Sequence, residues 1–297
     1  MLYRCCFLAP IALLFLLASP ALAQKKLLPL APTETYPEDT YLASCKKKRA
    51  MVIVAHDDDS GAMSGTLARL KSEGWTIHHL SFPGEDSARS HRHVAATQHL
   101  AQSITFLPFA EPQYRPRRDT AQPPYMPIPR AAFAQEFALE EIARQVEATV
   151  NAFDPAIIFT LDSEIGGYGH PDHVMISELV VTLTNSGRIY PERIYQNVYT
   201  DHMEEEIMVK RLAPKLKKWG YPSPYTAACE LYAINGMPEP TVQVTISPWA
   251  EEKMQRLRGY AGREARNLRK FIPDFDKYPA QTYFEVFDRE FFRVLEF

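Results

Sequence analysis

Two short segments of this sequence gather side chains that bind metals and move protons. The first is His56-Asp57-Asp58-Asp59, and the second contains Asp162 and then Gly166-Gly167-Tyr168-Gly169-His170-Pro171-Asp172-His173. Imidazole and carboxylate groups together are the donors that zinc and related divalent cations accept. A run of acids or one pair of histidines is, taken alone, more typical of a solvated turn or a helix end. The interpretation therefore depends on whether the two segments meet.

Each segment follows a predicted buried strand. Ala50–Ala55 and Ala156–Leu161 are short apolar runs of strand length, and each leads into one of the two segments. In an open parallel sheet, ligands bind at the carboxyl ends of the strands. We therefore expect the two segments to meet at one edge of a sheet and form a site. Pro171 suits the first turn of a helix, which would place His170 and His173 on one face at that helix start.

Strand-like and helix-like runs alternate along most of the chain, which predicts an α/β fold: a mostly parallel sheet with helices on both faces and a less regular C-terminal extension. The further predicted strands are Trp75–Phe82, Ile104–Phe109, Arg193–Thr200, Thr241–Ile246 and Tyr283–Phe287. The predicted helices are Gly61–Ser72, Ser87–Ala101, Ala131–Ala152, Pro171–Thr184, Glu204–Lys218 and Pro248–Lys270.

The N-terminus has the pattern of a secretory signal. A positive start is followed by the apolar run Cys5–Leu17 and by the small-residue site Ala21-Leu22-Ala23. The run is too short to span a bilayer comfortably. We therefore expect a signal peptide at 1–23, a polar leader at 24–49 and one domain at 50–297. The protein would be periplasmic or secreted, without a stable membrane anchor after cleavage.

Charge and cysteine content narrow the remaining possibilities. The formal net charge of -3 offers no electrostatic reason for nucleic-acid binding. After signal removal two cysteines remain, Cys45 and Cys229, and the sequence leaves open whether they pair or stay as buried thiols. The oligomeric state is also left open.

The segment Pro108–Pro129 holds seven prolines with arginines and tyrosines. This composition favours a stiff loop that could form one wall of a site.

The two segments together resemble a known family. Ala55-His56-Asp57-Asp58-Asp59 looks like the Ala-His-Pro-Asp-Asp-Glu signature of the PIG-L/LmbE-like N-acetylglucosaminyl deacetylases. Gly167-Tyr168-Gly169-His170-Pro171-Asp172-His173 resembles that family's second signature, in the same order along the chain. The resemblance implies a Rossmann-like core over about 50–200, with an extension over about 201–297.

The family resemblance also implies an activity, which is zinc-dependent hydrolysis of the N-acetyl group of an amino sugar in a glycan, glycolipid or glycoside. By position, the implied zinc ligands are His56, Asp59 and His173. Asp58 would be the general base that acts on the metal's water. The implied roles of the other residues are charge stabilisation or amine protonation for His170, oxyanion stabilisation for Tyr168 and orientation of a histidine for Asp172.

Two departures from the signature qualify the match. Asp57 replaces the family's proline, and Ser60 replaces its glutamate. Neither position is a ligand or base in the family pattern, so we expect activity to survive. The additional carboxylate could change the preferred metal, because two histidines and one aspartate also hold Fe(II). Arg89 and Arg92 follow the second strand and are candidates for contacting a sugar hydroxyl or a phosphate, with a solvated loop as the alternative.

The leading hypothesis is an exported zinc N-deacetylase. Two other classes remain open. One is a metal-containing glycan-binding protein with little or no turnover, suggested by Asp57 and Ser60. The other is an amidase or esterase that uses the same metal site on a non-sugar substrate. Acetate release from acetylated sugars and peptides distinguishes the three.

Overall fold

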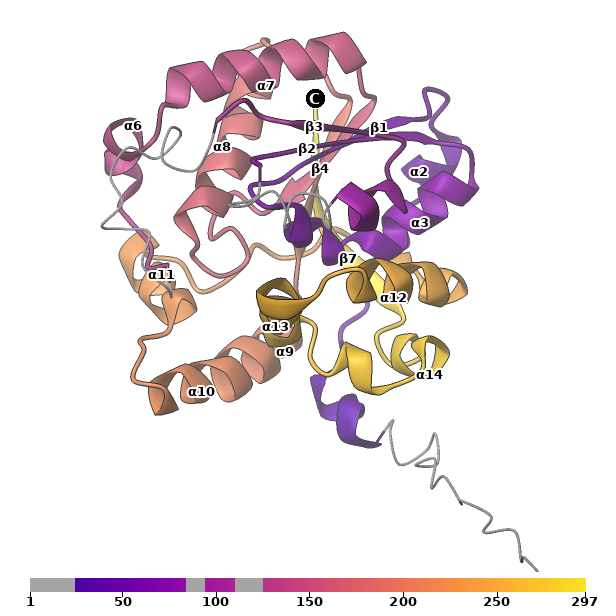
Figure 1. The fold of residues 1–297 in the computed structure, drawn as a ribbon, viewed down its shortest axis with the longest axis vertical. Coiled ribbons are helices and arrows are strands. Elements are labelled where there is room, and N and C mark those ends of the chain that lie inside the picture. The colour runs from indigo at the N-terminus through magenta and orange to yellow at the C-terminus, as the bar shows by residue number, and fades with distance from the viewer. Residues whose placement is uncertain (1–24, 84–93, 110–124) are drawn as a thin grey trace, which may run out of the picture.

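The computed structural model describes residues 25–83, 94–109 and 125–297. They form a mixed α/β fold around one seven-stranded sheet, drawn in Figure 1. The predicted signal peptide, part of the helix predicted at Ser87–Ala101, and most of the proline-rich loop lie outside the described residues. No helix among the described ranges is both long and apolar enough to cross a membrane.

The strands alternate with helices through the first two thirds of the chain. The strands are β1 (Arg49–Ile53), β2 (Thr76–Ser81), β3 (Ser103–Phe106), β4 (Ile157–Leu161), β5 (Arg193–Val198), β6 (Val242–Thr245) and β7 (Arg289–Glu296). The α-helices are α2 (Tyr41–Ser44), α3 (Ser64–Ser72), α6 (Phe133–Glu136), α7 (Leu139–Phe153), α8 (Pro171–Asn185), α9 (Asp201–Met203), α10 (Ala213–Lys218), α11 (Pro224–Tyr232), α12 (Ala250–Arg258), α13 (Gly262–Phe271) and α14 (Ala280–Phe284). A π-helical stretch, η5 (Glu204–Leu212), joins α9 to α10, and the 3-10 turns are η1 (Leu28–Leu30), η2 (Asp57–Gly61), η4 (Arg130–Ala132), η6 (Ser247–Trp249) and η7 (Phe275–Lys277).

The sheet has the order β3-β2-β1-β4-β5-β7-β6. The first five strands are parallel to their neighbours, whereas β7 is antiparallel to both β5 and β6. The chain therefore winds outward from β1 in one direction and from β4 in the other. In such a sheet the loops after the two central strands diverge and leave a crevice between them. That crevice is where the sequence predicts the site.

Alternate residues of β1 enter two separate hydrophobic cores. Ala50 and Val52 face the core that includes α3 and α12, and Met51 and Ile53 face the core that includes α7 and α8. Figure 1 shows α7 and α8 on one side of the sheet and α3 and α12 on the other. A strand that is buried on both faces has a continuous apolar sequence. The apolar residues Ala50–Ile53 therefore predict a strand of this kind. The α/β fold with helices on both faces is confirmed.

Two predicted elements in the C-terminal part are wrong. Tyr283–Phe287 is not a strand: Ala280–Phe284 is the helix α14, and Tyr283, Phe284 and Phe287 are all buried. Their spacing matches one turn of helix as well as a short strand. The strand is Arg289–Glu296, which the prediction missed. The single helix predicted at Pro248–Lys270 is instead η6, α12 and α13, with a break between Arg258 and Gly262.

The C-terminal extension is integral to the fold. Its strand β7 lies between β5 and β6, and Glu290 on β7 accepts hydrogen bonds from the backbone N–H groups of Gly65 and Thr66, both at 2.8 Å. These amides begin α3, so the carboxylate stabilises the positive end of that helix. Lys253 of α12 pairs with the same buried carboxylate. The extension therefore fixes the helix that follows the first motif.

Candidate metal centre

The first motif is held in a tight turn directly after β1. Residues Asp57–Gly61 form η2, and the His56 backbone N–H donates to the Asp59 carboxylate at 2.8 Å. This bond closes the turn and directs the Asp59 side chain back toward His56. Asp58, which lies between them in the sequence, is half-buried and lines a cavity together with His56 and Asp59.

The second motif is organised by a buried aspartate that does not face the metal donors. Asp162 accepts hydrogen bonds from the backbone N–H groups of four residues, from Glu164 to Gly167, at 2.6–3.2 Å. Burial raises the pKa of this carboxyl, and the four donors oppose that shift. Gly166, Gly167 and Gly169 all have positive φ, a region that glycine enters without steric cost. Asp162 therefore shapes the loop that carries Tyr168 and His170.

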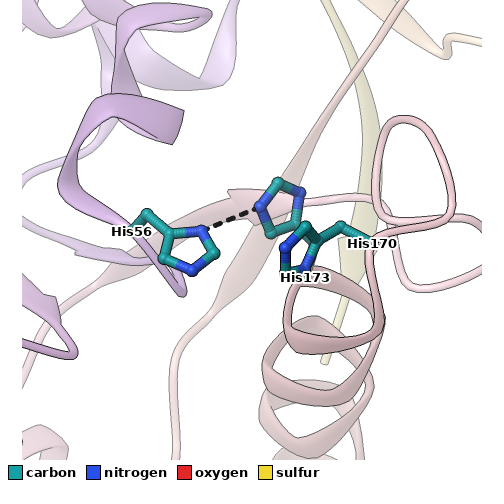
Figure 2. Close-up of side chains that lie close together, drawn as sticks. All are labelled: His56, His170 and His173. Atoms are coloured by element: carbon teal, nitrogen blue, oxygen red, sulfur yellow. Dashed lines mark hydrogen bonds between the residues drawn. The ribbon is translucent and has the colours of Figure 1, made fainter. Parts of the chain in front are cut away.

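Three predicted ligands converge across the crevice between β1 and β4. His56 Nδ1 lies 3.1 Å from His173 Nε2, and Figure 2 shows the two rings facing each other. The Asp59 carboxylate lies 3.2 Å from His173 Nε2 and 3.6 Å from His56 Nδ1. Neighbouring ligands of a tetrahedral ion with bonds of about 2.0–2.2 Å lie roughly 3.3–3.6 Å apart. The Asp59 carboxylate approaches His173 through Oδ1 and His56 through Oδ2, so the two nitrogens and this carboxylate already lie at distances close to those between the ligands of one ion.

Hydrogen bonds to the other ring nitrogens support this donor arrangement. His173 Nδ1 lies 3.0 Å from the Gly166 carbonyl, which can only accept, so the ring donates there and Nε2 keeps its lone pair. His56 Nε2 lies 3.4 Å from the Asp172 carboxylate, which leaves Nδ1 to face His173. Partners of this kind fix the tautomer and orientation of a metal-binding histidine. The residues present therefore fit a divalent cation.

His170 lies in the same cluster and is a further possible ligand. A donor atom of His170 lies within 4.8 Å of those of His56 and His173, and its ring stacks on that of His173 with centroids 4.5 Å apart. However, the Asp172 backbone N–H donates to His170 Nδ1 at 3.2 Å, so Nδ1 is the acceptor and Nε2 carries the proton of the neutral ring. His170 and Asp59 both lie close to the His56 and His173 donors, so either can complete a metal site with them.

Asp172 contacts two of these histidines. Its carboxylate lies 3.4 Å from His56 Nε2 and 3.9 Å from His170 Nδ1, and its side chain is buried. The family resemblance implied only that Asp172 orients a histidine. The distances identify His56 as its nearer partner.

Tyr168 lies beside the cluster and stays protonated. Burial and the nearby carboxylates of Asp59 and Asp58 raise the pKa of its hydroxyl well above the usual range. Its ring meets His173 edge-on at 5.2 Å and stacks on Phe271 at 4.5 Å. The hydroxyl is therefore a hydrogen-bond donor over the working pH range of most proteins, which is the state needed to stabilise an oxyanion.

The cluster opens into a cavity of about 370 Å³. Its lining includes both motifs, Tyr125 at the end of the proline-rich segment, and residues of α13. Tyr125 packs against His170 with ring centroids 4.3 Å apart, so this segment supplies an aromatic side chain to the site.

The candidate substrate residues Arg89 and Arg92 lie outside the described residues. Cys45 and Cys229 are free thiols.

The contacts between the C-terminal extension and the first motif were not predicted from the sequence. Arg256, on α12, donates to the Asp57 carbonyl at 2.9 Å and to Ser60 Oγ at 2.7 Å. The Tyr260 hydroxyl lies 3.1 Å from both the carbonyl and a carboxylate oxygen of Asp57. Arg256 and Tyr260 are buried. The only signal in the sequence was the arginine-rich run after Pro248, which also suits a solvated helix.

A family model described as GlcNAc-PI de-N-acetylase, PIG-L, matches residues 51–184, a segment that contains both motifs. The mycothiol S-conjugate amidase of Streptomyces coelicolor is 26% identical over 51% of this chain and 57% of its own length. A 1D-myo-inositol 2-acetamido-2-deoxy-alpha-D-glucopyranoside deacetylase of Rhodococcus erythropolis is 27% identical over 49% of this chain and 56% of its own length. The chain thus spans just over half the length of these two curated relatives.

Several solved structures share the general arrangement of elements. The N,N'-diacetylchitobiose deacetylase of Pyrococcus horikoshii has a TM-score of 0.47 and 16% identity, covering 92% of each chain. A teicoplanin deacetylase in its zinc-inhibited form has a TM-score of 0.49 and 14% identity over 84% of this chain and 98% of its own. A 4-carboxy-2-hydroxymuconate hydratase from Pseudomonas putida also reaches 0.49, at 12% identity over 83% of this chain and 95% of its own.

Similarities this distant include both deacetylases and a hydratase, so they indicate nothing about activity. The sequence match is more informative, because it covers the strands and loops that bring His56, Asp59 and His173 together. Residues 51–184 of this chain therefore match the PIG-L family model, in agreement with the resemblance of its two motifs.

Proposed function

We propose that this protein is a metal-dependent N-deacetylase that hydrolyses the N-acetyl group of an amino-sugar-containing substrate. The observation that carries the proposal is the convergence of His56, Asp59 and His173, with Asp58 and Tyr168, on one cavity within the segment that matches the PIG-L family model. Curated relatives at 26–27% identity are named as an amidase and a deacetylase of an acetamido sugar. Both names describe cleavage of an amide.

The proposed metal is zinc. Two histidines and one aspartate leave a coordination position open, which is the pattern of a catalytic zinc site. The same donor set also holds Fe(II). When bound, the metal would supply Lewis acidity, which polarises a carbonyl and lowers the pKa of water toward about 7. Metal analysis of the purified chain distinguishes the two ions.

The remaining chemistry is assigned to the chain's own side chains. Asp58 would accept the proton of the attacking water as general base. Tyr168 would donate a hydrogen bond to the oxygen that becomes negative as the amide carbonyl is attacked. His170, whose Nε2 carries a proton when the ring is neutral, would donate toward the departing nitrogen. The amine is a poor leaving group as an anion. Its nitrogen must therefore be protonated for the C–N bond to break.

Acetate release tests the proposal directly. The metal-loaded chain should release acetate from N-acetylglucosaminides, and a chelator should abolish release. Asp58→Asn should lower kcat by about 10²–10⁴-fold, because general-base catalysis has this magnitude, and should leave the metal content unchanged. Glu178→Gln, a half-exposed acid on α8 that pairs with Arg130, is the control. No acetate from any of a broad panel of N-acetylated sugars would contradict the proposal.

An amidase acting on a larger acyl group is a second candidate. The amidase name of the Streptomyces relative favours it, and the cavity of about 370 Å³ could accept more than an acetyl group. Comparing release of acetate with release of longer acyl groups, from sugars and from peptides, distinguishes it from the leading proposal. A glycan-binding protein without turnover would instead bind saccharides and form no product.

We also propose that the protein is exported to the periplasm or secreted. The support is the sequence of 1–23, with its positive start, apolar run and small-residue cleavage site. Mass spectrometry of the protein from a culture should find an N-terminus at Gln24. A full-length N-terminus in the cytosolic fraction would contradict export.

A further inference from the structure

The segment that includes α10 carries positive charge without acids. Residues 207–229 contain five lysines and arginines and no aspartate or glutamate. Two of the five lie on η5 and pair with carboxylates at 2.6 and 3.1 Å. The other three, Lys215, Lys217 and Lys218, are exposed, and no carboxylate of the described residues lies within ion-pair distance of them. The outer side of α10 therefore presents three uncompensated positive charges.

Exposed apolar side chains gather in the same segment. Trp219 and Tyr221 lie just beyond α10 and are 51% and 47% exposed, and Val209 and Leu231 on the flanking elements are exposed as well. These are four of the seven large hydrophobic side chains that are exposed in the described part of the chain. Single exposed apolar residues are common, but a cluster of them indicates a surface that contacts something apolar.

The charged and aromatic side chains share one surface, which lies beyond the cavity. Lys215 Nζ lies 5.1 Å from the centroid of the Trp219 ring. Leu212 and Leu216, four residues apart, are buried and line the cavity of the candidate metal centre. Figure 1 shows α10 at one extremity of the molecule, away from the central sheet. This helix thus borders the cavity on its inner side and presents cations on its outer side.

We infer that Lys215, Lys217, Lys218, Trp219 and Tyr221, together called the α10 surface, bind the surface of an anionic phospholipid membrane. Basic side chains are attracted to the anionic headgroups, and Trp and Tyr rings concentrate at the level of those headgroups. Charge alone would equally suit a soluble polyanion. The exposed rings favour a membrane, because they gain free energy only where an apolar layer lies beneath the anions.

The inference goes beyond the proposed function, since the α10 surface takes no part in the hydrolysis assigned to the two motifs. Its consequence for the site follows from the two sides of α10. Because Leu216 lines the cavity from the same helix, contact through the α10 surface would place the cavity close to the lipid headgroups.

Vesicle sedimentation tests this assignment. The protein to use is the chain from Gln24, which keeps every described residue and lacks the apolar run of 5–17, which could itself insert into lipid. This chain should bind phosphatidylcholine vesicles that contain about 30% phosphatidylglycerol, and it should bind pure phosphatidylcholine vesicles about tenfold more weakly or less. Raising the salt concentration should weaken binding, because ions screen exposed charges.

Lysine substitutions locate the charged part of the surface. Combining Lys215→Gln, Lys217→Gln and Lys218→Gln should weaken binding to the anionic vesicles by roughly 100-fold, since each basic residue near such a surface contributes about fivefold. The matched control makes the same change in the lysine run 46–48. This run directly precedes β1 and so lies at the opposite end of the strands from the cavity. The control removes the same charge and should leave binding nearly unchanged.

The aromatic residues have a separate test. Bound to vesicles with brominated lipid, the protein should show quenched tryptophan fluorescence, and Trp219→Phe should remove that quenching. Trp219→Ala combined with Tyr221→Ala should weaken vesicle binding by about tenfold or more, because two rings lose contact with the apolar layer. Tyr190→Ala is the control, since Tyr190 is also exposed but belongs to the segment before β5. It should leave binding unchanged.

Three results would overturn the inference. One is that anionic vesicles are not bound. Another is that the two sets of lysine substitutions weaken binding equally, which would mean that total charge and not the α10 surface attracts the lipid. The third is binding to a soluble polyanion such as heparin, or self-association through the two rings, without binding to vesicles. None of these results depends on acetate release, so this inference and the proposed function fail separately.

Discussion

Asp57 and Ser60, the residues at which the first motif departs from the family signature, share Arg256 as a partner. The Asp57 carbonyl and Ser60 hydroxyl accept from Arg256, and Asp57 is also contacted by Tyr260. A glutamate at position 60 would bring a buried charge to Arg256, whereas serine offers only a neutral acceptor. Both substitutions are thus accommodated by α12 and the turn after it. They do not remove a donor from the metal cluster.

The contact between Tyr260 and Asp57 supports the loop that carries Asp58, the proposed general base. Tyr260→Phe keeps the ring and removes the hydroxyl, which leaves a buried carbonyl and carboxylate with one donor fewer. The free energy of unfolding should fall by about 1–3 kcal/mol, the usual effect of leaving buried acceptors short of a partner. Urea unfolding measures this. Tyr221→Phe, at a residue that is 47% exposed, is the control, and equal effects of the two substitutions would contradict a supporting role.

Glu204 gives the protein a predictable response to pH. The residue is 6% exposed, and burial raises its pKa from 4.5 to about 7. Hydrogen bonds from Met237 and Tyr225 oppose this shift, and repulsion from Asp162 and Asp201 adds to it. A carboxyl whose pKa is higher in the folded than in the unfolded state makes its full contribution to stability at pH values below its unfolded-state pKa. That contribution is lost as the pH rises through about 7.

Glu204→Gln should remove this dependence. At pH 8 the glutamine chain should be more stable than the unsubstituted chain by up to about 3 kcal/mol, and near pH 4.5 the difference should be smallest. The measurement is the free energy of unfolding in urea at a series of pH values for both chains. Glu206→Gln, on the same π-helical stretch and paired with Lys210, is the control. A difference independent of pH would contradict the raised pKa.

The sequence predicted the candidate ligands, which the structure brings together, but not the residues that contact their loops. His56, Asp58, Asp59 and His173 stand in compact motifs, so their residue types and order are enough to group them. Arg256 and Tyr260 come from a segment about 200 residues further along the chain, and their pattern is that of an ordinary amphipathic helix. Nothing local distinguishes an arginine that faces water from one that faces a buried carbonyl.

At the scale of elements, strands buried on both faces were predicted well. β1 and β4 are continuous apolar runs, and only a sheet covered on both sides requires that pattern. The C-terminal elements were harder because they are half-exposed. Tyr283, Phe284 and Phe287 fit one turn of α14 or a short strand equally, and β7 carries charges among its apolar residues. Which alternative holds is decided by packing against α12 and β5, which are distant in sequence.

The glycine-rich loop before α8 supports a further prediction. Gly167 and Gly169 have φ of 78° and 89°, so alanine is strained at both. At Gly169 a Cβ would also lie 2.5 Å from the Ala228 Cβ and 2.8 Å from the Pro224 carbonyl, whereas at Gly167 it would meet nothing within 4 Å.

Gly167→Ala should therefore cost only the backbone strain, about 1–2 kcal/mol. Gly169→Ala should cost clearly more, because α11 must move away from the loop. Thermal or urea unfolding of the two variants compares them, and each serves as the other's control. Equal losses of stability would show that α11 does not press on this loop.

For the whole molecule, the metal would contribute to stability as well as chemistry. An ion that binds only the folded chain stabilises it by about 2.7 kcal/mol at 100 times its Kd, which corresponds to roughly 4–5 °C in Tm for a chain of this size. A chelator should lower Tm by this amount, and calorimetry measures the shift. The same chelator should not shift the Tm of His173→Gln. An unchanged Tm in both chains would mean that no metal bridges the two motifs.

The position of β7 also determines when the protein can fold. β5 pairs on one side with β7, and within the described residues β6 joins the sheet through β7. As the chain emerges N-terminus first, at the ribosome or after export, β5 remains an open edge until residues 289–296 emerge, and α3 lacks the carboxylate of Glu290 until the same moment. An incomplete chain therefore cannot close its own sheet, and it exposes an unpaired strand edge of the kind that aggregates. Dependence on a chaperone should accordingly be greatest for nascent chains that end before β7.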